Sequence, residues 1–176
     1  MDFNYRLAGL VDIPDIERLM QCSITKLLGH YVNEDELEAS FESMGLDDQL
    51  IKDKTYFLIY FEELMVGCGG WSNRKTLFGG NHTPNRSNDF LNPNKDAAKI
   101  RAMYTHPDWA RKGVGTLILE IAEQEASIGG FKSCELMATL SGVHLYKARG
   151  YKIDDEIIYK SKKGNSVKMF KMIKHL

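Results

Sequence analysis

Residues 103–116 have the sequence MYTHPDWARKGVGT, in a chain of 176 residues. The first three residues of this segment complete a run of apolar and β-branched residues, 97–105, that predicts a strand. Pro107 follows at once and predicts a tight turn. After the turn, Gly113 and Gly115 open a stretch in which apolar residues recur at helical spacing. The sequence therefore predicts a strand, a turn and a helix in immediate succession.

This turn has the composition of an anion-binding loop. The first turn of a helix offers unpaired N–H groups and the positive end of the helix dipole. Gly113 and Gly115 remove side chains that would keep a ligand away from these N–H groups, and Arg111 and Lys112 add positive charge. Together these features predict a pyrophosphate cradle. The alternative is that the glycines only permit a sharp turn between strand and helix.

Neither of the two commonest phosphate-binding motifs explains the turn. Ile118 stands where GxGxxG needs its third glycine, and GxxxxGK[ST] does not occur. Instead, residues 103–116 resemble the acyl-CoA signature of the GNAT superfamily of N-acyltransferases, in which a strand leads through [V/T]-H-P into [Q/R]-x-x-G-x-[G/A]. A second block, ATLSGVHLYKARGY at 138–151, is similar to the family segment that ends in [F/L]-Y-x-x-x-G-[F/Y].

The two blocks come in the family's order, with one helix and one strand between them. The chain departs from the family at Ala110, where a Gln or Arg usually stands three residues before the first glycine. It also departs at Ser141, where the family often has Asn. The first departure affects a side chain of the cradle and leaves its backbone unchanged. The hydroxyl of Ser141 could still bond the pantetheine arm or a water.

Upstream of the first block, the sequence predicts two helices and a hairpin. A cap at Asp12 begins a helix, and Asn33 with Glu36 forms a capping box for a second, so that two helices lie between about 12 and 45. Aromatic and β-branched residues at 55–61 predict a strand whose partner is 64–71. The glycine run at 67–70 either packs under a helix or serves the substrate side.

Residues 73–95 are rich in Asn, Gly and Pro and have no periodicity, which predicts a long functional or mobile loop. Trp71, Phe78 and Phe90 could wall an acceptor pocket or anchor this loop. Lys99 and Arg101 make the strand after it less apolar than a buried strand.

Downstream, the sequence predicts a helix up to Gly129-Gly130, a strand at 133–138, a short helix at 143–148 and a final hairpin of 151–159 with 167–173. This order predicts a mixed sheet with helices packed on it, an α/β or α+β class. The resemblance covers nearly the whole chain. It implies a mostly antiparallel central sheet flanked by helices, with a splayed central strand pair.

Composition indicates a single domain, 1–176, with 23 basic and 24 acidic residues. The balanced charge argues against nucleic acid as a partner. Three widely spaced cysteines fit neither a disulfide framework nor a zinc ribbon and are typical of the reduced cytosol. With no signal peptide and no apolar run of roughly 18 residues, we expect a cytoplasmic protein that does not interact with membranes.

The resemblance implies an N-acetyltransferase that moves an acetyl group from acetyl-CoA, without a metal, to a primary amine of a small molecule or peptide. The amine would attack the thioester directly, and Tyr146 would be the general acid. The cofactor-binding residues implied are Met103, Tyr104, Thr105, Arg111, Lys112, Gly113, Val114, Gly115, Thr116 and Ser141. The alternative is a catalytically silent CoA-binding sensor or interaction domain.

The general base stays open at this stage. Tyr104, His82 and Asp89 are candidates, and a water relay is an equal alternative. We expect His106 to be structural, because it faces the phosphate turn. The exposed sheet edges of the terminal hairpin could pair two copies of the chain in a homodimer.

Overall fold

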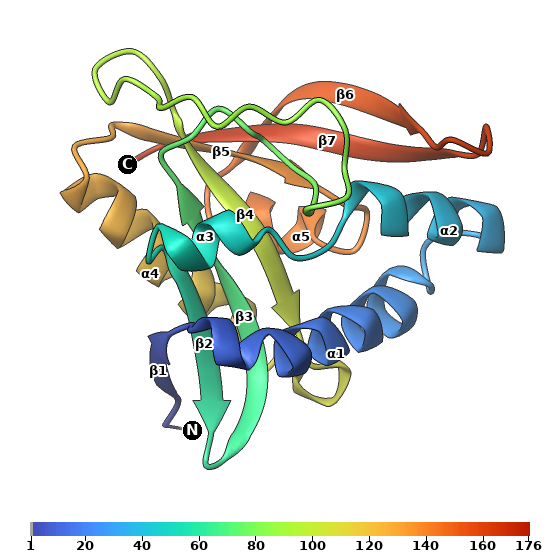
Figure 1. Ribbon diagram of the computed structural model, residues 1–176, viewed down its shortest axis with the longest axis horizontal. Coiled ribbons are helices and arrows are strands. Elements are labelled where there is room, and N and C mark those ends of the chain that lie inside the picture. Colours follow the sequence, from blue (N-terminus) through green and yellow to red (C-terminus); the bar gives the residue numbers. More distant parts are fainter. Residues whose placement is uncertain (1) are drawn as a thin grey trace.

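The computed structural model describes residues 2–176 and contains one seven-stranded sheet (Figure 1). The strand order is β1-β2-β3-β4-β5-β7-β6. All neighbouring strands are antiparallel except β4 and β5, which are parallel. The strands are β1 (Asn4–Leu7), β2 (Tyr56–Phe61), β3 (Leu64–Ser72), β4 (Ala98–Thr105), β5 (Ser133–Ala138), β6 (Lys152–Lys160) and β7 (Ser166–His175). The mixed, mostly antiparallel sheet predicted from the sequence is confirmed.

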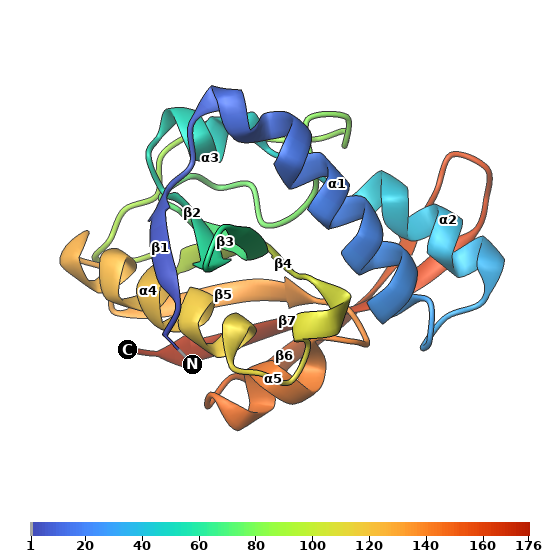
Figure 2. The same cartoon turned by 90° about the horizontal axis from the view of Figure 1, so that it is seen from below.

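Helices cover both faces of this sheet (Figure 2). One face carries α1 (Ile13–Ser23), α2 (Glu34–Ser43) and α3 (Asp48–Lys52), and the other carries α4 (Val114–Ile128) and α5 (Val143–Ala148). Two single turns, η1 (Leu10–Asp12) and η3 (Pro107–Trp109), precede α1 and α4, and a π-helical turn, η2 (Ile24–Leu28), continues α1. None of the helices within residues 2–176 has the length and apolar character needed to cross a membrane.

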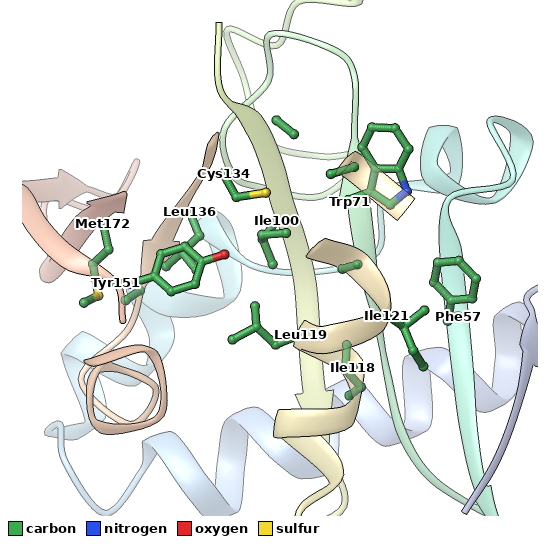
Figure 3. Packing of buried hydrophobic residues seen from close by; sticks show 14 of the residues in the cluster. Phe57, Trp71, Ile100, Ile118, Leu119, Ile121, Cys134, Leu136, Tyr151 and Met172 are labelled. Atoms are coloured by element: carbon green, nitrogen blue, oxygen red, sulfur yellow. The ribbon is translucent and has the colours of Figure 1, made fainter. Parts of the chain in front are cut away.

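Two hydrophobic cores follow from the alternation of side chains along the strands. Phe57 of β2 packs with Ile118 and Leu119 of α4 in the larger core, which Figure 3 shows. Leu58, the next residue of β2, packs with Ile16 of α1 in the second core. The central strands are therefore buried on both faces.

Local signals account for several of these elements. The capping box of α2 is present, because Asn33 and Glu36 exchange two hydrogen bonds of 2.9 Å. A Cβ on Gly69 would lie 2.6 Å from Cγ2 of Ile118, and one on Gly67 would collide with Val114. The glycine run of β3 thus lets α4 approach the sheet. Of the two alternatives for this run, packing under a helix is the one that the structure shows.

The structure corrects the expectations for three elements. Strand β1 precedes the first helix, and the sequence did not predict the short helix α3. The third correction concerns β4, which is buried although it carries two cations. Lys99 is 7% and Arg101 3% exposed, because Lys99 pairs with Glu135 and Arg101 pairs with Asp47.

Candidate active site

A β-bulge interrupts β4 where it passes the middle of β3. Cys68 lies opposite Tyr104 but Gly70 lies opposite Arg101, so β4 holds one residue more than β3 in this interval. Ala102, within the bulge, has a left-handed φ of 49°. The buried hydroxyl of Tyr56 donates a hydrogen bond of 2.7 Å to the carbonyl of Ala102. Because bulges bend a strand and turn its side chains, this one changes the course of β4.

A cavity lies between the second halves of β4 and β5. The two strands pair only through Ala98 with Cys134 and Lys99 with Glu135 in residues 2–176, and they diverge beyond these pairs (Figure 1). The cavity has a volume of about 80 Å³. Its wall comes from the end of α2, the long loop, β4, β5, α5 and β7, and consists of Ser43, Met44, Gly45, Leu77, Phe78, Gly79, Ile100, Arg101, Ala102, Met103, Tyr104, Leu136, Met137, Thr139, Tyr146 and Met169.

Tyr146 brings a phenol from α5 to this cavity. Its hydroxyl lies 3.8 Å from the sulfur of Met103, and its ring packs edge-on against Tyr151 with 6.0 Å between centroids. Burial raises the pKa of Tyr146 to about 12. The phenol therefore keeps its proton at neutral pH and can act as a hydrogen-bond donor in the cavity.

The turn after β4 places the amino end of α4 at the surface. The first hydrogen bond into the helix runs from N of Leu117 to the carbonyl of Gly113, so the amides of Val114–Thr116 precede it. Gly113 has φ 92° and a Cβ there would meet no atom within 4 Å, so the backbone conformation requires the glycine. A Cβ on Gly115 would lie 2.9 Å from Leu145, so there the packing of α5 favours glycine.

Two cations flank this helix end. The side chains of Arg111 and Lys112 are exposed, and Nζ of Lys112 lies 4.9 Å from the centroid of the Trp109 ring. Val114 points its side chain into the core, so only its backbone is available to a ligand. His106 accepts a hydrogen bond of 3.3 Å from N of Asp108 through Nδ1, which caps the η3 turn.

Most of the predicted cofactor residues lie on β4 and on the turn and helix that follow it. Met103 and Tyr104 line the cavity, and Thr105 ends the strand before the turn that leads to Gly113 and α4. Ser141 lies between β5 and α5, and its hydroxyl is 3.1 Å from that of Thr139, which lines the cavity. Strand β4 therefore connects the cavity wall, which includes Tyr146, to the turn before α4.

The three candidate bases lie in different places. Tyr104 lines the cavity, its hydroxyl accepts a hydrogen bond of 3.0 Å from N of Gly45, and burial raises its pKa. The ring of His82 packs against Gly45, where an added Cβ would lie 2.8 Å from Cε1 of the ring. Its Nε2 forms a hydrogen bond of 2.8 Å with the carbonyl of Phe41. Asp89 is exposed and pairs with Lys75 at 3.1 Å.

A buried charge cluster holds the long loop against the cavity. Arg101 donates to the carbonyls of Thr76 and Gly79, at 2.8 and 2.7 Å, and to Asp47 at 3.0 Å. Asp47 also pairs with Arg86 of the loop. These contacts bring Leu77–Gly79 into the cavity wall. The only sequence signal for this arrangement was a cation inside a predicted strand.

The three aromatic residues near the loop separate into two roles. Phe78 lines the cavity and packs edge-on against Tyr159, with 6.1 Å between ring centroids. Trp71 is buried against Phe131, and Phe90 lies under the guanidinium of Arg74 at 4.3 Å. Trp71 therefore belongs to the larger core and Phe90 stacks on a side chain of the loop itself, so Phe78 is the aromatic residue of the three that lines the cavity. Within residues 2–176, His, Cys, Asp and Glu side chains form no cluster of three or more that could hold a metal ion.

One family model matches more than half of the chain, and solved structures share its fold. The family model described as acetyltransferase (GNAT) domain matches residues 52–153. A GCN5-related N-acetyltransferase from Rhodopseudomonas palustris has a TM-score of 0.74 at 17% identity, over 100% of this chain and 97% of that one. PaiA N-acetyltransferase from Thermoplasma acidophilum, solved with coenzyme A, has a TM-score of 0.67 at 14% identity, over 100% of both chains. YncA from Salmonella typhimurium, a putative acetyltransferase solved with acetyl-CoA, has a TM-score of 0.65 at 13% identity, over 100% of this chain and 95% of that one. No curated protein matches the sequence.

Proposed function

The chain belongs to the GNAT family of acetyltransferases, and we propose that it transfers the acetyl group of acetyl-CoA to a primary amine by direct attack in a ternary complex. The observation that carries this proposal is that the bulged strand β4 and the phenol of Tyr146 line one cavity, while β4 leads through a single turn to the open amino end of α4. The coenzyme A and acetyl-CoA in the two structural neighbours support the choice of donor.

The amino end of α4 suits the pyrophosphate of CoA. The space beside Gly113 is open, the amides of Val114–Thr116 lie in the first helical turn, and two exposed cations stand at Arg111 and Lys112. Helix N-termini bind phosphate through such amides and the helix dipole. The backbone of Met103–Thr105 would bond the pantetheine amides, and the hydroxyl of Ser141 would bond the same arm. Acetyl-CoA bound here would supply a thioester that an amine can attack.

Tyr146 would serve the leaving thiol. As the amine attacks, negative charge develops on sulfur, and a donor placed there stabilises the transition state. The raised pKa of Tyr146, about 12, ensures that the donor is protonated. A thiol has an ordinary pKa of about 8.5, so complete proton transfer from Tyr146 to the thiolate is uphill, and the phenol acts first as a hydrogen-bond donor to the negative charge that develops on sulfur. Tyr146 acts on the leaving group and leaves the deprotonation of the amine to another route.

The test is an assay of the purified chain with acetyl-CoA and a panel of primary amines, including peptides. Release of free CoA is measured together with the acetylated amine by mass spectrometry. We expect both products in equal amounts with at least one amine. Tight binding of acetyl-CoA with no acetylated product from any amine would contradict the proposal and favour a CoA-binding sensor.

A further inference from the structure

Glu42 brings a carboxylate to the edge of the cavity. It stands just before Ser43, which ends α2 and lines the cavity. One of its carboxylate oxygens accepts a hydrogen bond of 2.9 Å from N of Lys162, in the turn between β6 and β7. Within residues 2–176 this side chain forms no ion pair, so its negative charge is available to a ligand.

Two aromatic rings lie beside this carboxylate. Phe78 lines the cavity, and its ring packs edge-on against Tyr159 with 6.1 Å between centroids. Tyr159 lies on the cavity side of β6, because Ile157, two residues before it, is paired with Met169 of the cavity wall. Burial and the nearby charge of Glu42 raise the pKa of Tyr159. Glu42, Phe78 and Tyr159 therefore meet at one place, which we call the rim.

Lys163, the hairpin cation that the charge of Glu42 affects, is paired with another carboxylate. Its Nζ pairs with Glu38, one turn earlier on α2, and Glu38 raises the pKa of Lys163 more strongly than Glu42 does. Asn165 also donates a hydrogen bond of 3.3 Å to Glu38. Among the described residues, side chains of the hairpin thus satisfy Glu38, whereas Glu42 receives a backbone N–H.

The surroundings of the rim also offer polar groups. Ser161, in the hairpin turn, is 8% exposed, and its hydroxyl has no hydrogen-bond partner within residues 2–176. Inside the cavity, Arg101 is paired with Asp47 at 3.0 Å, and Ser43 and Thr139 add polar surface to the wall. An amine that carries a charge is therefore accommodated both in the cavity and at the rim.

A carboxylate pairs with a cation, and the faces of aromatic rings attract one. We propose that the rim binds a positive charge of the acceptor, so that the acceptor is an amine with a second cationic group. One nitrogen enters the cavity and takes the acetyl group, while the second stays charged beside Glu42. Linear diamines represent this class. The proposal rests on the proposed acetyl transfer and names the acceptor for it.

The second nitrogen takes no part in the chemical step. The first nitrogen attacks the thioester carbon, a C–N bond forms, and the C–S bond breaks with its electron pair on sulfur. The extra proton of the first nitrogen leaves to solvent, and the second nitrogen keeps all of its protons. The rim therefore affects which amine is bound and leaves the bonds that change as they are in any acetyl transfer.

Diamines and monoamines of equal chain length test this proposal. We would measure kcat/KM at pH 7.5 and saturating acetyl-CoA for the series from 1,3-diaminopropane to 1,6-diaminohexane, each beside its monoamine. We expect at least one diamine to exceed its monoamine by about tenfold, more than the factor of about two that its two equivalent nitrogens give, since an ion pair and a cation–π contact add together. Added salt should reduce this advantage in the parent chain, because salt screens a partly exposed ion pair.

The Glu42→Gln variant removes the charge and keeps an oxygen that accepts from N of Lys162. We expect the diamine advantage to fall to about the statistical factor of two in this variant. Glu38→Gln is the matched control, because Glu38 lies on the same helix and is already paired with Lys163. It should keep the full advantage.

A second readout does not depend on turnover. Calorimetric titration into the protein–CoA complex should show 1,5-diaminopentane binding about tenfold more tightly than pentylamine, with the difference lost in Glu42→Gln and kept in Glu38→Gln. Diamines that bind and react no better than their monoamines, or an advantage that Glu42→Gln keeps, would overturn this proposal and leave the acetyl transfer intact. A diamine that binds through Glu42 while no amine is acetylated would overturn the proposed function and leave the rim as a cation site.

Discussion

The hydroxyl of Tyr146 on α5 lies 3.8 Å from the sulfur of Met103 on β4. The neighbouring residue on α5, Leu145, packs where a Cβ of Gly115 would lie at the amino end of α4. One short helix therefore contributes to the wall of the cavity and packs against the amino end of α4. This arrangement sets the distance between the phenol and the turn by packing, so both ends of the site depend on α5.

The proposed binding of the CoA pyrophosphate at the turn before α4 can be tested by removing its two cations. We expect the double variant Arg111→Ala, Lys112→Ala to bind CoA about tenfold more weakly, because hydrogen bonds to charged groups contribute about 1.5–3 kcal/mol and salt screens part of this. Isothermal titration with CoA measures the effect. S-acetylpantetheine, which lacks the pyrophosphate, should be used equally well as a donor by both proteins.

Lys132→Ala is the matched control, because Lys132 is an exposed lysine beyond the far end of α4. It should bind CoA like the parent chain. Unchanged CoA affinity in the double variant would place the pyrophosphate elsewhere.

The bulge of β4 depends on Tyr56. In Tyr56→Phe, the carbonyl of Ala102 loses its 2.7 Å hydrogen bond from the buried Tyr56 hydroxyl. We expect the free energy of unfolding to fall by about 1–3 kcal/mol, measured by urea denaturation, and acetyl transfer to slow because Ala102 and Met103 line the cavity. Tyr5→Phe, on the exposed β1, is the control and should change stability little. A stable Tyr56→Phe variant with parental turnover would show that the bulge does not need this bond.

Local patterns in the sequence account for much of the fold. Three predicted features depend on only a few neighbouring residues each, and the structure contains all three. They are the capping box at Asn33, the hairpin of β2 and β3, and the turn before α4. Strand β1 was missed because all four of its residues are exposed, so it lacks the alternation that marks a half-buried strand.

Contacts between distant residues account for what could not be predicted. Arg101 and Asp47 are separated by 54 residues, and the solvent-free position of Arg101 makes sense only when both are known. Gly45, just after α2, and Phe78, in the loop, also line the cavity, and their sequence distance from β4 hides this from any local pattern. The resemblance to a family indicated where the cofactor side of the site lies, whereas the acceptor side depends on these long-range contacts.

The charge cluster at Asp47 should be critical for stability. In Asp47→Ala, Arg101 becomes a buried cation without its partner, and such a loss costs about 3–5 kcal/mol. Urea denaturation measures this directly. Glu38→Ala removes the exposed partner of Lys163 and should cost less than about 1 kcal/mol. Equal stability of the two variants would contradict the importance of the cluster for the loop.

The start of the long loop should become less stable in acid. The hydrogen bonds of Arg74 lower the pKa of Asp53 below its usual 3.8. The pair therefore stabilises the fold fully above the unfolded pKa, near 4, and this contribution is lost as the pH falls through the lower folded value. We expect Asp53→Asn to be about 1–3 kcal/mol less stable than the parent at pH 7, and the difference to shrink below about pH 4.

Denaturation curves at several pH values give this comparison. Asp89→Asn is the control, since its pair with Lys75 is exposed, and it should show the smaller loss at pH 7. A difference between Asp53→Asn and the parent that stays constant down to pH 2 would assign the effect to packing rather than to charge.

The most direct test of the account is the acetyl-transfer rate of Tyr146→Phe, measured beside its affinity for CoA. The substitution keeps the ring that packs against Tyr151 and removes only the hydroxyl near Met103. Loss of a general acid typically costs 10²–10⁴-fold in rate, so we expect kcat to fall by on the order of 100-fold with CoA affinity unchanged. Equal turnover in the variant and the parent would contradict the role of Tyr146.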